Sequence, residues 1–176
     1  MDFKDLLIVV DAQNDFLLPT GKLFIGHDTT EYRKRLGEFV HKFPGDRFAT
    51  RDSHPGNSVE FEMFPEHCID LSNGWQLIKE INIYKFNKVF DKSSYNSHEI
   101  SSTVASMKKS VIYVVGVCIS ICVHDIIVGI INEAKNTYNQ TPKIKIIRNL
   151  VDDFDPEMAE FSLKRLQKLY GVEIIE

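Results

Sequence analysis

Three residues with complementary chemistry each follow a segment that is typical of a buried strand. They are Asp11, Lys92 and Cys122, and the segments before them are Leu6–Val10, Val89–Asp91 and Val114–Cys118. In open parallel α/β sheets, ligands bind at the carboxyl ends of the strands. A carboxylate, an ammonium and a thiol that meet at this edge would supply a base, a positive charge and a nucleophile. This is the minimal equipment of a cysteine-based acyl hydrolase.

Each of these residues also has an ordinary structural explanation when it is taken alone. An aspartate at a strand end often caps the next turn, a lysine is usually solvated, and a lone cysteine is more often a small buried apolar residue. Cys122, however, lies near the start of a predicted helix, where backbone N–H groups favour a thiolate and could hold an oxyanion. We interpret Cys68 as a packing residue, and we expect the backbone of Cys118 to matter more than its sulfur.

A second group of polar residues lies in the long irregular segment Arg51–Gly74. Asp52 and His54 follow the second predicted strand, and His67 lies farther along. Two imidazoles and a carboxylate form an open ligand set for a divalent first-row metal, with positions left for water and substrate. Glu60 could approach such a metal directly or through water. The alternative is that the two histidines are unrelated surface residues, since the chain contains six.

The composition indicates one globular domain that spans residues 1–176. Of its residues 43% are hydrophobic and 26% charged, which suits a sizeable core. A net charge of −4 without a basic stripe argues against a nucleic-acid partner. The apolar run near the N-terminus is too short for a signal peptide or a membrane span. Three cysteines do not form a disulfide framework, so we expect a reduced, cytoplasmic protein without a membrane partner.

Apolar runs alternate with amphipathic ones along the chain, which predicts βα units and a parallel sheet. The predicted strands are Leu6–Val10, Arg47–Thr50, Lys88–Phe90, Val111–Val115, Lys143–Ile147 and Val172–Ile175. The predicted helices are Thr30–Phe43, Trp75–Ile81, Glu99–Lys108, Ser120–Ala134, and one that Asp155 caps and Gly171 closes. Right-handed crossovers then give an α/β fold with a doubly wound, mainly parallel sheet of about six strands and helices on both faces.

The segment Ser120–Ala134 is apolar on most of its sides. This pattern is typical of a helix that is buried from more than one direction. It predicts that the helix packs both on the sheet and on a second subunit, so we expect a homo-oligomer.

Six segments resemble the motifs of the isochorismatase-like cysteine hydrolases, and most of all those of the nicotinamidases and pyrazinamidases. In chain order they are Val10–Phe16, Gly21–Ile25, Thr50–Pro55, Phe64–Cys68, Asp91–Asn96 and Gly116–Val123. Val10–Phe16 resembles the opening motif D-x-Q-x-D-F, and Gly116–Val123 resembles the turn G-V-A-T-D-x-C-V that carries the nucleophile. The likeness runs in order from residue 6 to about residue 175.

The resemblance implies a three-layer α/β fold and a catalytic triad of Asp11, Lys92 and Cys122. It also implies a cis peptide bond before Cys118, which is unusual because that residue is not proline. Such a bond would turn the Cys118 amide toward the Cys122 amide, and the two amides would form an oxyanion hole.

The resemblance further implies one divalent metal ion held by Asp52, His54 and His67, with Glu60 contributing in some members of the family. Zinc is the expected ion, although iron or manganese suits the same ligands.

The activity implied by the resemblance is hydrolysis of nicotinamide, and of related small aromatic carboxamides, to the acid and ammonia through a thioester on Cys122. We expect Phe16, Phe64 and Tyr95 to sandwich the aromatic ring of the substrate. Another small-amide or N-carbamoyl hydrolase of the same superfamily, or a non-catalytic ligand-binding homologue, remains an alternative. An ether hydrolase such as isochorismatase itself has little use for a thiol nucleophile.

The chain departs from the family pattern at a few positions, none of which removes a reacting group. Ile119 and Ser120 replace Thr-Asp in the nucleophile turn, Ile126 and Gly129 replace Thr and Asp on the following helix, Phe64 replaces Trp, and Asn96 replaces Ser. These departures bear on which substrate is used and on the rate of turnover.

Overall fold

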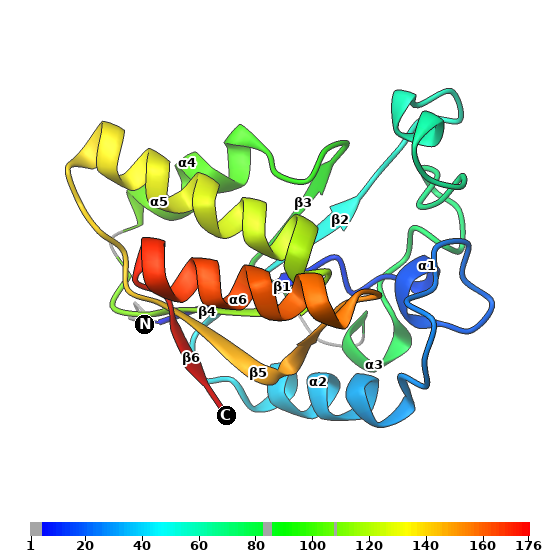
Figure 1. Cartoon of the computed structure of the whole chain (residues 1–176), viewed down its shortest axis with the longest axis horizontal. Coiled ribbons are helices and arrows are strands. Elements are labelled where there is room, and N and C mark those ends of the chain that lie inside the picture. The colour runs from blue at the N-terminus through cyan, green and yellow to red at the C-terminus, as the bar shows by residue number, and fades with distance from the viewer. Residues whose placement is uncertain (1–4, 83–85, 108) are drawn as a thin grey trace.

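The computed structural model contains one sheet that runs through the centre of the molecule (Figure 1). It describes residues 5–82, 86–107 and 109–176. Within these ranges the sheet has six strands in the order β3-β2-β1-β4-β5-β6, and every neighbouring pair is parallel. The strands are β1 (Leu6–Val10), β2 (Asp46–Asp52), β3 (Lys88–Lys92), β4 (Ile112–Val117), β5 (Ile144–Asp152) and β6 (Glu173–Ile175). The predicted fold class is therefore confirmed.

Helices cover both faces of the sheet (Figure 1). One face carries α4 (His98–Ser106), α5 (His124–Tyr138) and α6 (Pro156–Tyr170), and the other carries α2 (Thr30–Lys42) and the short α3 (Lys79–Asn82). Along β1, Leu6, Ile8 and Val10 face the first group, whereas Leu7 and Val9 face the second. Because side chains alternate along a strand, β1 is buried over its whole length. None of the helices in the described ranges combines the length and the apolar character that a membrane span needs.

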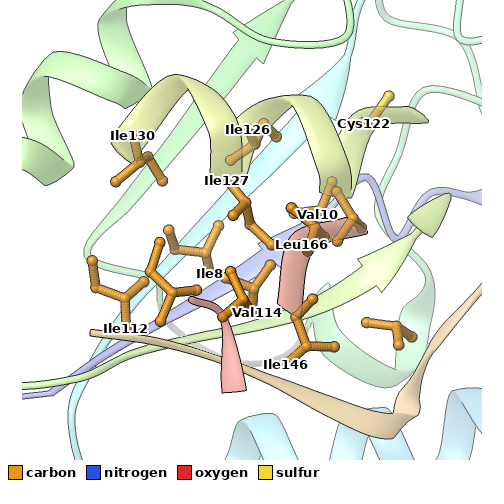
Figure 2. Packing of buried hydrophobic residues seen from close by; sticks show 14 of the residues in the cluster. Ile8, Val10, Ile112, Val114, Cys122, Ile126, Ile127, Ile130, Ile146 and Leu166 are labelled. Carbon is orange, nitrogen blue, oxygen red and sulfur yellow. The ribbon is translucent and has the colours of Figure 1, made fainter. Parts of the chain in front are cut away.

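Figure 2 shows the apolar layer between α5 and the sheet. Ile126 and Ile130 of α5 lie over Ile8 and Val114 of the two central strands, and Cys122 lies at the N-terminal end of this layer. The packing that holds α5 on the sheet therefore also fixes the position of the thiol. Since a single chain already buries the isoleucines of α5, a second subunit is not needed to cover them. The homo-oligomer stays a prediction.

The predicted helix Trp75–Ile81 is wrong over most of its length, because only Lys79–Asn82 is helical. Ahead of α3 the backbone pairs with the segment that follows β1, where Leu77 forms an antiparallel bridge with Gln13. A partner so distant in sequence leaves no trace in the local apolar pattern. The segment after β1 also contains a short helix that was not predicted, α1 (Asn14–Leu17).

The strand predicted at Lys143–Ile147 continues as β5 to Asp152. Its register against β4 shifts between Val114 and Gly116, and the strand then ends with Asp152 beside Val117. This irregularity brings the residues after β5 next to the residues after β4.

The helix predicted at Ser120–Ala134 begins with a π-helical turn at Ile119–Val123 and continues as α5. The helix predicted at Glu99–Lys108 is found as α4, and Lys108 lies outside the described residues. A 3-10 helix at Val59–Glu62 interrupts the long irregular segment. The remaining predicted elements are found, with ends shifted by no more than two residues.

Strands β1 and β4 approach each other closely at Gly116. Its φ is +114°, and a Cβ at this position would lie 2.0 Å from the carbonyl oxygen of Val10. Glycine alone tolerates both the conformation and the contact. Gly116 thereby sets the spacing between the end of β1, which leads to Asp11, and the end of β4, which leads to Cys122.

Replacing Gly116 with alanine should therefore destabilise the protein. The positive φ alone costs about 1–3 kcal/mol, and the clash with Val10 adds to it. We expect the midpoint of urea unfolding to fall in Gly116→Ala. Gly56→Ala is the matched control, because its Cβ would meet nothing within 4 Å. Equal midpoints for the two variants would contradict this account of Gly116.

Candidate active site

The structure brings the three sequence-predicted residues Asp11, Lys92 and Cys122 together at the carboxyl edge of the sheet. Asp11 follows β1, Lys92 ends β3, and Cys122 lies in the π-helical turn after β4. The Lys92 Nζ lies 2.7 Å from the Asp11 Oδ2 and 3.5 Å from the Cys122 Sγ. All three residues are buried. Strand ends far apart in sequence therefore deliver a carboxylate, an ammonium and a thiol to one point.

Thr50 orients the carboxylate of Asp11, a role that was not predicted. The Thr50 hydroxyl donates to the Asp11 Oδ1 at 2.6 Å, and the Asp11 amide donates to the Thr50 carbonyl at 3.2 Å. Asp11 itself adopts the left-handed conformation, with φ +44°, which aspartate tolerates better than most residues. This conformation turns the chain out of β1 at the residue that carries the carboxylate. The only sequence signal for Thr50 is its place in the segment Thr50–Pro55.

Burial and the neighbouring charges raise the pKa of all three groups. Burial disfavours the charged form of Lys92, but Asp11, Cys122 and Asp52 outweigh burial and raise the pKa of Lys92 well above its ordinary value. Burial raises the pKa of Asp11 although Lys92 opposes the shift, and the charge of Asp52 adds to the rise. Burial also raises the pKa of the Cys122 thiol, again against the charge of Lys92.

The turn that carries Cys122 has an irregular backbone. The peptide bond between Val117 and Cys118 is cis, as the family resemblance implied. The Cys118 carbonyl then accepts hydrogen bonds from the amides of Ile121 and Val123, at 3.2 and 3.1 Å. Within this fully described turn the Cys122 amide, which lies between those two donors, makes no bond to that carbonyl. π-Helical turns of this kind are frequent at functional sites.

Three further predicted residues form a compact donor group beside the triad. Ligand atoms of Asp52, His54 and His67 all lie within 4.8 Å of one another, and all three residues are buried. The Nε2 atoms of His54 and His67 lie 2.9 and 3.3 Å from the Asp52 Oδ2. The other oxygen of Asp52, Oδ1, accepts a hydrogen bond from Lys92 at 3.2 Å.

The outer partners of this group fit a divalent metal ion. The His67 Nδ1 lies 2.7 Å from the Pro65 carbonyl oxygen, so it donates there, and the Nε2 that faces Asp52 is the ring atom left to bind a metal. The His54 Nδ1 lies 3.3 Å from the Ser58 hydroxyl, which allows the same orientation. Oriented imidazoles of this kind are typical of metal ligands. Glu60 is not part of the donor group, but it lines the adjoining pocket.

A small pocket opens beside the thiol, and Asp52 and His67 of the donor group form part of its wall. The pocket is lined by the predicted aromatic residues Phe16, Phe64 and Tyr95, and by Leu23, Ile121 and Phe154, which were not predicted. The rings of Phe16 and Phe64 lie near that of His67, with centroid distances of 5.7 and 6.3 Å. The lining is mainly apolar and suits a flat aromatic ligand.

Two departures from the family pattern form one contact away from the reacting groups. The Asn96 Oδ1 accepts a hydrogen bond from the Ser101 hydroxyl at 3.1 Å, and a Cβ at Gly129 would lie 2.1 Å from the Asn96 Nδ2. The missing side chain at position 129 therefore leaves the room that the amide occupies. Two other departures, Ile119 and Ile126, are buried in the apolar core.

Comparisons with known proteins agree with this architecture. The nicotinamidase of Saccharomyces cerevisiae is 24% identical over 218 residues, which cover 97% of this chain and 98% of that protein. PnC1 from L. infantum in complex with nicotinate superposes with a TM-score of 0.85 at 22% identity, over 99% of this chain and 93% of that one. The pyrazinamidase of Pyrococcus horikoshii in complex with zinc has a TM-score of 0.78 at 21% identity, over 98% and 99% of the two chains.

At these identities the structural likeness establishes the shared fold. The family assignment rests on the sequence model of the isochorismatase domain, which matches residues 5–176. Because this match covers nearly the whole chain, the protein belongs to the isochorismatase family.

Proposed function

We propose that this chain is a cysteine amidohydrolase that converts nicotinamide and related small aromatic carboxamides to the acid and ammonia. The observation that carries the proposal is the buried contact of Lys92 with both Asp11 and Cys122, next to an aromatic pocket. A buried thiol alone is commonly a packing residue. A thiol beside a buried carboxylate–ammonium pair has the partners that nucleophilic catalysis needs.

The similar proteins support this substrate class. The relative from Saccharomyces cerevisiae is named a nicotinamidase, and the structure from L. infantum binds nicotinate, which is the acid that nicotinamide hydrolysis releases. The aromatic lining of the pocket by Phe16, Phe64 and Tyr95 gives a flat ring apolar surfaces to lie against.

In the first half of the proposed reaction, Cys122 forms a thioester with the acyl group of the substrate. Asp11 accepts the thiol proton as the Sγ attacks the amide carbon, and the ammonium of Lys92 offsets the negative charge on sulfur. The raised pKa of Asp11 makes it a stronger base than an exposed aspartate. Asp11 then gives the proton to the amide nitrogen, the C–N bond breaks, and ammonia leaves.

In the second half, water takes the place of ammonia. Asp11 accepts a proton from the water as its oxygen attacks the thioester carbon. The C–S bond breaks, the proton returns from Asp11 to the sulfur of Cys122, and the carboxylic acid is released. One amide and one water thus give one acid and one ammonia, and the thiol is restored.

The tetrahedral intermediates of both halves carry a negative oxygen. We assign its stabilisation to the amides of Cys118 and Cys122, at a value of about 3 kcal/mol per donor.

Asp52, His54 and His67 would hold the divalent metal ion that the donor group fits. When bound, the ion would supply a Lewis-acidic point that helps to place the substrate ring. Zinc is the proposed ion, in line with the zinc complex of the pyrazinamidase from Pyrococcus horikoshii. The chain itself contributes the orientation of the ring through the aromatic residues around His67.

Removing the thiol should abolish turnover but not ring binding. We expect Cys122→Ala to lower the rate of ammonia release from nicotinamide by about a thousandfold or more, because no thioester can form. Binding of nicotinate, measured by calorimetry, should stay within about threefold, since the pocket walls are unchanged. Cys68→Ala is the matched control, because Cys68 is also a free buried cysteine but does not line the pocket. Its turnover should stay normal. Turnover by Cys122→Ala at the wild-type rate would overturn the assignment.

Removing the metal should lower turnover reversibly. We expect dialysis against a chelator to lower ammonia release and added zinc to restore it, because the substrate ring loses a point that places it. His67→Ala should lower both the metal content, measured by mass spectrometry of the acid-digested protein, and turnover. His98→Ala serves as the control, because this histidine lies exposed at the start of α4. A chelated protein with full activity and no metal would exclude the role proposed for the ion.

A further inference from the structure

A buried aspartate outside the candidate triad is bonded to the turn that carries the thiol. Asp153 directly follows β5, and only 4% of its surface is exposed. Its Oδ2 accepts a hydrogen bond from the Ser120 amide at 2.7 Å, and its Oδ1 accepts one from the Asp155 amide at 3.0 Å. Both carboxylate oxygens therefore bind backbone N–H groups, and one of these groups belongs to the turn Ile119–Val123.

The sheet explains why Asp153 lies there. Asp152 ends β5 beside Val117, which ends β4, so the residues that follow the two strands leave the sheet next to each other. The first N–H groups of a helix have no partner inside the helix and need an acceptor from outside. Cys118, at the capping position of the turn, makes no side-chain cap hydrogen bond. Asp153, at the end of the neighbouring strand, accepts the Ser120 amide in place of the missing local cap.

Asp153 also distinguishes the two thiols of the turn by charge. Burial raises the pKa of the Cys118 thiol, and the negative charge of Asp153 raises it further. Cys122 instead lies beside the ammonium of Lys92, whose charge acts in the opposite direction. The carboxylate therefore disfavours a thiolate at Cys118, while the ammonium favours one at Cys122.

We propose that Asp153 is a positioning residue, which holds the Ser120 amide and thereby fixes the turn so that Cys122 meets Lys92. This role rests on the amide hydrolysis proposed above, because alignment of the nucleophile matters for that reaction. A displacement of about 1 Å in an active site can cost about a hundredfold in rate. Phe154, next to Asp153, also lines the pocket, but Phe16, Phe64 and Tyr95 lie on other segments. The metal donors lie on another segment as well, so substrate binding depends less on Asp153.

The first test compares two aspartates that each accept two backbone amides. Asp155 caps α6 by accepting the amides of Glu157 and Met158, both at 3.0 Å, and it has no bond to the nucleophile turn. We expect Asp153→Ala to lower kcat by about tenfold to a hundredfold with KM within about threefold. Asp155→Ala should leave kcat within about twofold, even if the mutation lowers the melting temperature as much as Asp153→Ala does. Asp153→Asn keeps one acceptor oxygen and should recover most of the lost kcat.

The second test does not depend on amide turnover. Iodoacetamide labelling, mapped by mass spectrometry, should favour Cys122 over Cys118 in the wild-type protein. Asp153→Ala should slow labelling of Cys122 and speed labelling of Cys118, so that their ratio falls by about fivefold or more. Asp155→Ala should leave the ratio unchanged.

The two tests separate failure of the positioning role from failure of the proposed function. If the wild-type protein hydrolyses no amide but Asp153→Ala still shifts the labelling ratio, the substrate assignment fails and the positioning role stands. An Asp153→Ala protein with wild-type kcat and labelling ratio would overturn the role. A loss of kcat that matches the loss in Asp155→Ala would also overturn it, because the effect would then follow stability alone.

Discussion

The site depends on one buried positive charge. The Lys92 side chain is only 1% exposed, and its ammonium lies 2.7 Å from Asp11 and 3.2 Å from Asp52. Taking an ammonium out of water costs several kcal/mol, so it is tolerated only beside matching negative charge. Removing one partner of a buried pair typically costs about 3–5 kcal/mol. The charge of Lys92 therefore couples the candidate base, the candidate nucleophile and the metal donor group, so that a change at one is felt at the others.

The parallel sheet meets this requirement by its topology. Neighbouring strands β3, β2, β1 and β4 end at the same edge and deliver Lys92, Asp52, Asp11 and, through the next turn, Cys122. Side chains then fix the ends of the strands. For example, Gln13 donates to the Asp52 carbonyl at 2.8 Å and accepts from the Asp52 amide at 2.7 Å, as a neighbouring strand would. Alignment of the site is thus a property of the whole sheet edge rather than of any one loop.

Local sequence patterns were enough to predict the strands and the meeting of Asp11, Lys92 and Cys122. Apolar runs mark buried strands, and polar residues after such runs in a parallel sheet must share one edge. The spacing of Asp52 and His54 was likewise informative, because two ligands close together in an extended segment can face the same point. His67 joins them because the segment after β2 folds back on itself, where His54 forms a parallel bridge with Ile69.

The unpredicted contacts that changed the fold or placed the site join distant segments. The pairing of Leu77 with Gln13 replaced a predicted helix, and the continuation of β5 placed Asp153 and Phe154 beside the nucleophile turn. The alternation of apolar residues describes each strand separately. It therefore could not predict the register shift between β4 and β5 or the position of the residues after β5. The hydrogen bond from Thr50 to Asp11 belongs to the same class, because it depends on the register between β2 and β1.

The proposed reaction requires that Cys122 becomes acylated during turnover. The most direct test is to mix the protein with nicotinamide, quench the reaction in acid within the first turnovers, and locate any acyl group by mass spectrometry of peptides. We expect a nicotinoyl adduct on Cys122 and on neither of the other two cysteines, Cys118 and Cys68. Turnover that proceeds with the acyl group on another residue would contradict it.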